Sequence, residues 1–154
     1  MDYEIHFDSR TAPESIANAL VQRYGIPSER ILTADQVAFS SGRWPMALII
    51  PAPAGDEHFA CVLEAGDELA DAIGHISERE LTTVLCRAIG TRAIILDGRP
   101  GYDTWLLVGP DGTHHSVTVD KAAVEEGNFV ITATSPIPQI ASDKRARGSR
   151  PLAL

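Results

Sequence analysis

The stretch TWLLVGPDGTHHSVTV, residues 104–119, carries the strongest indication of the fold in this chain. Its two arms, 104–108 and 113–119, are rich in β-branched and other apolar residues, and the segment GPDG between them is a typical turn sequence. The stretch therefore predicts a β-hairpin, in which the two strands are antiparallel.

Further strands are expected on both sides of this hairpin. Apolar and polar side chains alternate over residues 3–8, which predicts a strand with one buried side and one side facing solvent. Short apolar runs predict strands at 46–50, 59–63, 93–96 and 129–134. Because a turn rich in Pro, Ala and Gly separates the first two runs, residues 46–63 are expected to form another hairpin.

The first helix is expected near the N-terminus. Thr11 and Glu14 have the spacing of a capping box, Pro13 suits the first helical turn, and Gly25 suits the end of the helix. Residues 28–44 are harder to interpret, because their pattern fits either short strands or a single helical turn.

Two more helices are expected in the middle of the chain. One follows Gly66 and is expected to be short, because Gly74 interrupts its apolar pattern. Ser77 and Glu80 form a second capping box, which predicts a stronger helix that ends at Gly90.

This order of elements predicts an α+β fold: a largely antiparallel sheet with two to three helices packed on one face. Residues 1–134 are expected to form a single domain. Residues 135–154 alternate Pro, Ser and charge with little to bury, which predicts a disordered tail.

The charge is unevenly distributed along the chain. Residues 135–154 hold four cations and one anion, whereas residues 1–134 carry 9 cations and 20 anions, a net charge of −11. A strongly acidic folded part repels nucleic acid and anionic membranes and favours basic partners. No apolar run is long enough to cross a membrane, and no signal peptide is recognisable, so a cytoplasmic protein is expected. The preference for Arg over Lys and the abundance of Ala suggest a bacterial origin.

Four carboxylates stand out between the expected hairpin and the short helix. They are Glu64, Asp67, Glu68 and Asp71, which occupy positions i, i+3, i+4 and i+7. On a helix this spacing would place like charges along one face, at a cost in stability that a cationic partner could relieve. These four acids are therefore the predicted charged part of a partner-binding surface.

Aromatic residues in two loops are the predicted anchors of that surface. Arg43 and Trp44 lie in a loop flanked by Gly and Pro, and Tyr102 and Trp105 border the late hairpin. Buried aromatic and Arg side chains commonly supply most of the energy at the centre of a protein interface.

Motifs for catalysis or for cofactors are not found in the sequence. There is no glycine-rich phosphate loop, no zinc-binding spacing of His and Cys, and no nucleophile elbow. No catalytic residue, cofactor or metal is therefore predicted. Cys61 and Cys86 lie in apolar segments and are expected to be buried and free.

The favoured hypothesis is a non-enzymatic binding module. In size, acidity and fold class the chain is similar to bacterial immunity proteins, which bind and block a toxin, and a nuclease toxin would supply a basic surface. One alternative is a secretion chaperone or another dimeric partner-binding protein. The other is an enzyme, or a metal- or ligand-binding protein, in which His6 and either His114 or His115 converge with Asp or Glu in a cleft.

Overall fold

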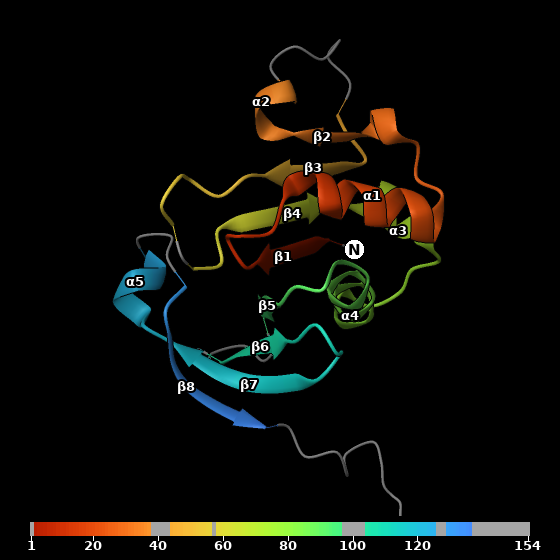
Figure 1. The fold of residues 1–154 in the computed structure, drawn as a ribbon. Helices are drawn as coiled ribbons and strands as arrows, with labels where there is room; N and C mark the ends of the chain where they lie inside the picture. Colours follow the sequence, from red (N-terminus) through yellow and green to blue (C-terminus); the bar gives the residue numbers. More distant parts are fainter. Residues whose placement is uncertain (1, 38–43, 57, 97–103, 126–128, 137–154) are drawn as a thin grey trace, which may run out of the picture.

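Eight strands form one sheet in the computed structural model, which describes residues 2–37, 44–56, 58–96, 104–125 and 129–136. Their order across the sheet is β2-β3-β4-β1-β5-β6-β7-β8 (Figure 1). The strands are β1 (Tyr3–Phe7), β2 (Ile31–Thr33), β3 (Ala47–Ile50), β4 (Cys61–Ala65), β5 (Ala93–Leu96), β6 (Thr104–Val108), β7 (His114–Val119) and β8 (Ile131–Pro136). All neighbouring strands are antiparallel except β2 and β3, so the predicted α+β class is confirmed.

Both predicted hairpins are present. β6 and β7 pair in register around the turn at 109–113, and β3 pairs with β4. β1 then lies between β4 and β5, so the N-terminal strand joins the two halves of the sheet.

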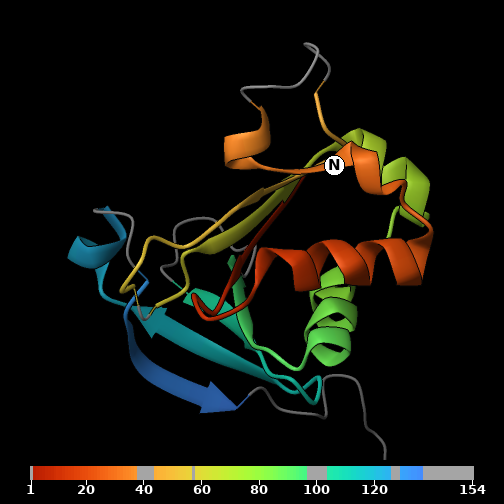
Figure 2. The same cartoon turned by 45° about the horizontal axis from the view of Figure 1, so that its top comes forward.

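The described residues contain five α-helices and one 3₁₀ turn. They are α1 (Pro13–Tyr24), the 3₁₀ turn Ser28–Arg30, α2 (Ala34–Val37), α3 (Asp67–Ile73), α4 (Glu78–Ile89) and α5 (Lys121–Glu125). The two long helices, α1 and α4, cross each other on the same side of the sheet (Figure 2). None of the described helices is long and apolar enough to pass through a bilayer.

The main hydrophobic core lies between this side of the sheet and the helices. Ile16 and Leu20 of α1, Leu81 and Leu85 of α4, and Leu69 of α3 are all fully buried in it. Three helices thus contribute to the core on one face, as the sequence predicts.

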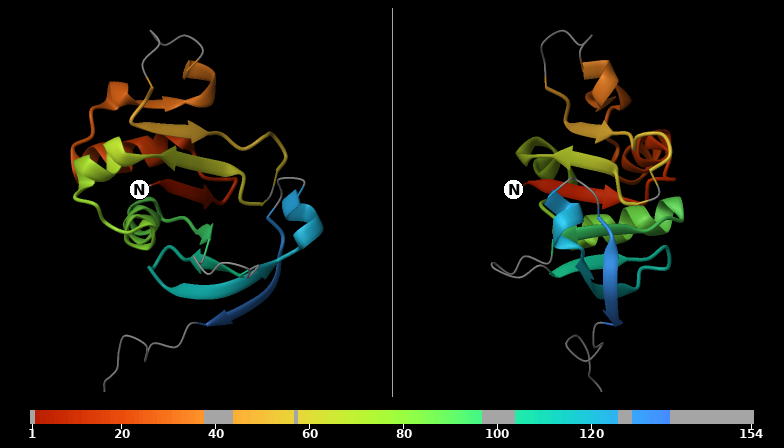
Figure 3. Two further views of the ribbon diagram at one scale, coloured as in Figure 1. Left: turned by 180° about the vertical axis from the view of Figure 1, so that it is seen from behind. Right: turned by 90° about the vertical axis from the view of Figure 1, so that its left-hand side faces the viewer.

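A second, smaller core covers part of the opposite side of the sheet. Its buried residues are Phe59, Ile94, Val117, Val119 and Phe129. It lies mainly over the β5–β8 half of that side, and His6 of β1 packs at its edge. Beyond that edge, Glu4, Leu48 and Glu64 of β1, β3 and β4 point away from the main core. Figure 3 shows this side, with β3, β4 and β1 in front of α1, α3 beside one end and α5 beside the other.

Local sequence signals for helix ends succeed at α4 and α3. The Ser77 hydroxyl accepts a hydrogen bond from the Glu80 N–H at 3.1 Å, as the capping box predicts. Gly74 ends α3 in the left-handed conformation, with φ 83°, and so interrupts the helix as expected.

The capping box predicted for α1 is wrong. Ala12, and not Thr11, is the N-cap residue, and it provides no side-chain cap. The Thr11 hydroxyl instead lies 2.7 Å from the Thr91 hydroxyl, at the start of the chain segment that leads into β5. A long-range contact therefore replaces the local one.

Both cysteines are free and buried, as the sequence predicts. Burial raises the pKa of Cys61 to about 11 and that of Cys86 to about 12. Neither thiol is therefore activated as a nucleophile at neutral pH. β8 ends at Pro136, and the remainder of the expected tail, residues 137–154, lies outside the described residues.

Candidate functional site

The four predicted acids do not form one helical stripe. Glu64 lies on β4, and only Asp67, Glu68 and Asp71 lie on α3. The helical spacing breaks at Gly66, where the strand ends and the helix begins. All four residues are exposed, so the structure places them on one continuous segment of surface, at the end of β4 and along α3.

Glu64 instead belongs to a pair of like charges across two strands. It lies directly opposite Glu4 of β1, and on its other side it lies opposite Leu48 of β3. Residues directly opposite each other on antiparallel strands have Cβ atoms about 4.5–5.5 Å apart, and like charges in such pairs cost stability. No ion pair to the Glu64 carboxylate is found among the described residues.

These strand residues line a groove on the side of the sheet away from the main core. The groove has a volume of about 400 Å³. Its lining residues are Asp2, Tyr3, Glu4, Trp44, Pro45, Leu48, Glu64, Ala65 and Gly66. Trp44, one of the predicted anchors, is 75% exposed at this groove. The structure therefore brings together Glu64 and Trp44, which are twenty positions apart in the sequence.

Arg30 connects the groove to α3. Its guanidinium donates two hydrogen bonds to the Glu68 carboxylate, at 2.9 and 2.7 Å, and one to the Trp44 carbonyl oxygen at 3.2 Å. The Arg30 side chain is only 14% exposed, so its charge is held in a fixed position. Glu68 thus has a cation of its own and serves to position the backbone of Trp44.

The remaining acids of α3 and the other predicted anchors have different surroundings. Asp71 is paired at 2.8 Å with His75, which follows the end of α3. Trp105 is only partly exposed, because its ring packs in the second core against His6 and Phe129. Arg43 and Tyr102 lie outside the described residues.

Asp2, Glu4 and Leu48 are groove residues that the sequence analysis did not identify. The alternating pattern of residues 3–8 does place Glu4 on the outer side of its strand. The pairing of β1 with β4, which sets Glu4 beside Glu64, has no local signal because the two strands lie more than fifty residues apart in the chain.

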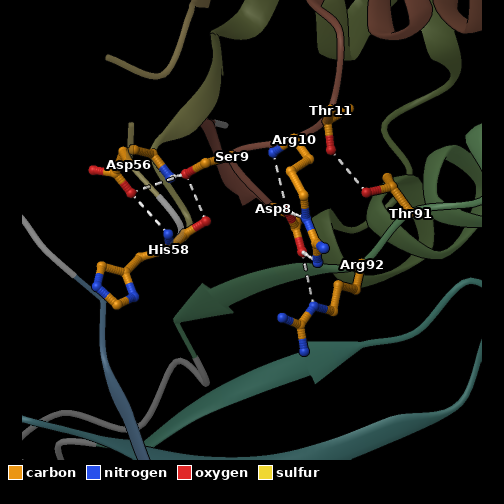
Figure 4. Close-up of polar contacts among 9 residues, drawn as sticks. Asp8, Ser9, Arg10, Thr11, Asp56, His58, Thr91 and Arg92 are labelled. Carbon is orange, nitrogen blue, oxygen red and sulfur yellow. Dashed lines mark hydrogen bonds and ion pairs between the residues drawn. The ribbon is translucent and has the colours of Figure 1, made fainter. Parts of the chain in front are cut away.

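A second polar cluster, also missed from the sequence, lies at the other end of β1 (Figure 4). Asp8 is only 4% exposed and accepts hydrogen bonds from the side chains of Arg10, at two positions of 3.1 Å, and of Arg92, at 3.0 Å. Burial by itself would raise the pKa of Asp8, but these hydrogen bonds outweigh burial and lower the pKa far below its usual range.

A cavity of about 470 Å³ adjoins this cluster, between the start of α1 and the end of α4. Asp8, Arg10 and Arg92 line it, together with Thr11 and Thr91. The Asp8 carboxylate joins two cations from separate parts of the chain, so the cluster ties the segment after β1 to the start of β5.

Ser9, Asp56 and His58 meet beside this cluster but do not form a hydrolytic triad. The Ser9 hydroxyl donates to the main-chain carbonyl of His58 at 2.6 Å and lies 3.1 Å from an Asp56 carboxylate oxygen. The Asp56 carboxylate accepts from the main-chain N–H of His58 at 2.7 Å. The His58 ring points away from Ser9 (Figure 4), so it is not placed to remove the hydroxyl proton.

The histidines proposed to converge in a cleft do not do so. His6 and His115 lie on the same side of the sheet, but the register through Ile94 and Leu107 separates them by three strand spacings, about 14 Å. His114 points to the opposite side, where its Nε2 atom lies 2.9 Å from the Thr83 hydroxyl of α4. Among the described residues, no group of three or more His, Cys, Asp and Glu is arranged to hold a metal ion.

No protein-family model matches this chain, and no solved structure matches it significantly.

Proposed function

We propose that this protein is an acidic, non-enzymatic binding module that occludes a basic protein partner, in the manner of an immunity protein acting on a nuclease toxin. The observation that carries the proposal is the groove in which exposed Trp44 adjoins the carboxylates of Asp2, Glu4 and Glu64. A single exposed apolar side chain is ordinary on a protein surface, but here Trp44 adjoins further apolar surface from Pro45 and Leu48 and carboxylates of one sign. An apolar patch rimmed by polar groups is typical of an interaction site.

Charge would direct the encounter with the partner. The carboxylates of Asp2, Glu4 and Glu64 line one groove, Asp67, Glu68 and Asp71 lie on the helix that follows Gly66, and residues 1–134 carry a net charge of −11. Complementary charge chiefly accelerates association and selects among partners, and the effect weakens as salt is added.

Apolar contact would then hold the complex together. Trp44 is an exposed aromatic residue, and Pro45 and Leu48 supply apolar surface beside the charged side chains. A central aromatic anchor surrounded by polar groups is the usual arrangement of an energetic hot spot. The blocking of a basic active site requires no chemistry from this protein.

Association kinetics test the proposal. Affinity capture with the intact chain supplies the partner, and stopped-flow mixing then measures the association rate constant at low and at high salt. In the Glu4→Gln/Glu64→Gln double variant we expect this rate constant to fall about threefold to tenfold at low salt, and the difference should vanish at high salt.

The matched control neutralises two acids on the helical side, in the double variant Glu14→Gln/Glu80→Gln. Both residues are exposed and lie on α1 and α4, which cover the opposite side of the sheet from the groove carboxylates. The control should lose much less of the low-salt rate. Equal rates for the wild type and the groove variant at low salt would contradict the proposed function.

A further inference from the structure

We propose, on the basis of the proposed function, that the groove accepts an arginine side chain of the basic partner. The guanidinium would lie against the Trp44 indole and between the carboxylates of Glu4 and Glu64.

The first support is the way in which Trp44 is held. Its side chain is 75% exposed, yet its carbonyl oxygen accepts a hydrogen bond from Arg30, and Arg30 is itself fixed by two hydrogen bonds to Glu68. An exposed indole on a restrained backbone loses less conformational entropy on binding than one on a free loop. Its face is available to a cation, which aromatic rings attract through their negative π surface.

The second support is the pair of like charges across β1 and β4. The Glu4 side chain is 63% exposed, and its carboxylate lies 3.4 Å from Nε2 of the buried His6. Glu64 lies directly opposite Glu4, and among the described residues no cation is paired with it. A single cation placed between the two carboxylates would relieve their repulsion and would replace the missing partner of Glu64.

The side chains that line the groove favour arginine over lysine. A guanidinium is planar and presents five N–H donors, so it can bridge two carboxylates and stack on an indole at the same time. An ammonium is a compact and strongly hydrated point charge that cannot stack in this way. The apolar surface of Pro45 and Leu48 would contact the methylene groups of the entering side chain.

Nuclear magnetic resonance on the intact ¹⁵N-labelled chain tests this assignment. The probes are two blocked tripeptides of equal charge, acetyl-Gly-Arg-Gly-amide and acetyl-Gly-Lys-Gly-amide. The Trp44 indole N–H signal, assigned with the variant Trp44→Phe, reports on the groove, and the Trp105 indole signal serves as an internal control. We expect the arginine peptide to shift the Trp44 signal and to bind at least about threefold more tightly than the lysine peptide.

Two variants locate the binding. Trp44→Leu and Glu64→Gln should each weaken binding of the arginine peptide, whereas Glu14→Gln should leave it unchanged. All three side chains are exposed, so the fold is expected to persist, and the Trp105 signal checks this.

The inference is overturned if both peptides shift the Trp44 signal equally, or if the arginine peptide leaves it unmoved. Either result can occur while the complete partner still responds to Glu4→Gln/Glu64→Gln, in which case the proposed function stands and only the preference for arginine is wrong. If the low-salt association rate constant of the partner is unchanged by those two substitutions, the proposed function itself is wrong, regardless of the peptide results.

Discussion

The two ends of β1 use carboxylates in opposite ways. At its C-terminal end, Asp8 is buried and accepts hydrogen bonds from two arginines. At its N-terminal end, Glu4 is exposed and lies opposite a second carboxylate, that of Glu64. The first arrangement satisfies a charge inside the protein and stabilises the fold. The second sets two carboxylates side by side on an exposed surface, and among the described residues no cation is paired with Glu64.

The two tryptophans show the same contrast on one side of the sheet. Trp105 packs against both His6 and Phe129 in the second core, with ring centroids 6.0 and 4.8 Å away. Trp44 is 75% exposed at the groove. Because the second core lies mainly over β5–β8 and reaches only as far as His6 of β1, the same strand alternation produces a core at one end and an exposed groove at the other.

The largest effect is expected at the buried carboxylate. The substitution Asp8→Asn removes charge-assisted hydrogen bonds to Arg10 and Arg92, so we expect the free energy of unfolding to fall by about 2–3 kcal/mol. Urea denaturation measures it. Asp71→Asn is the exposed control and should leave stability unchanged within error. Equal stabilities of Asp8→Asn and the wild type would show that the cluster does not hold β1 and β5 together.

An intermediate effect on stability is expected when the pH is lowered and His6 takes up a proton. His6 is 7% exposed and its Nδ1 atom has no hydrogen-bond partner among the described residues. Burial lowers the pKa of His6, and the nearby carboxylate of Glu4 only partly opposes this. The folded protein therefore takes up a proton less readily than the unfolded chain, in which the pKa is about 6.5. The contribution of His6 to stability is thus complete above that pH and is lost as the pH falls below it.

Between pH 7.5 and 5.5 we expect the wild type to lose about 1 kcal/mol of unfolding free energy through His6. The variant His6→Phe lacks the titrating group and should lose less over the same range. The pKa of His114 is also lowered, by burial and then by Arg79 and Arg87, but His114 is present in both proteins and cancels in the comparison. Identical pH slopes for the two proteins would show that His6 is not the group responsible.

The smallest effect is expected at the groove, and it has the opposite sign. Because Glu64→Gln removes a like-charge repulsion with Glu4, we expect the Tm at low salt to rise by about 1–2 °C. Glu14→Gln removes a favourable acid from the first turn of α1 and should not raise the Tm. A lower Tm for Glu64→Gln would mean that the Glu64 carboxylate stabilises the folded protein, and it would contradict the proposed repulsion between Glu4 and Glu64.

Signals confined to a few neighbouring residues predicted the fold well. The β6–β7 hairpin, the Ser77 cap of α4 and the end of α3 at Gly74 all depend on turn and capping geometry within four or five residues. The α1 cap failed because the Thr11 hydroxyl found a partner eighty residues away. A hydrogen bond between neighbouring residues can be predicted from the sequence. A competing hydrogen bond to a residue of a distant element cannot, because its position depends on the whole fold.

Only some residues of the candidate site could be predicted from the sequence. Glu64 and Trp44 were identified by charge and by loop composition, but Glu64 was assigned to a helical stripe that does not exist. Glu4 was visible as the outer residue of a strand, with no indication of its neighbour. The neighbour depends on strand order, and β1 pairs with β4 although α1, β2, α2 and β3 lie between them in the chain.

Composition and short-range pattern were enough to establish an acidic α+β body with antiparallel hairpins, because residue charge and strand alternation do not depend on distant contacts. The folded arrangement alone set Glu4 against Glu64, brought Arg30 to Glu68 and Trp44, and surrounded Asp8 with two arginines. Strand order and register bring together residues far apart in the chain, and they are set by burial of the whole core. For that reason no single segment encodes which carboxylates end up paired with a cation and which remain open to solvent.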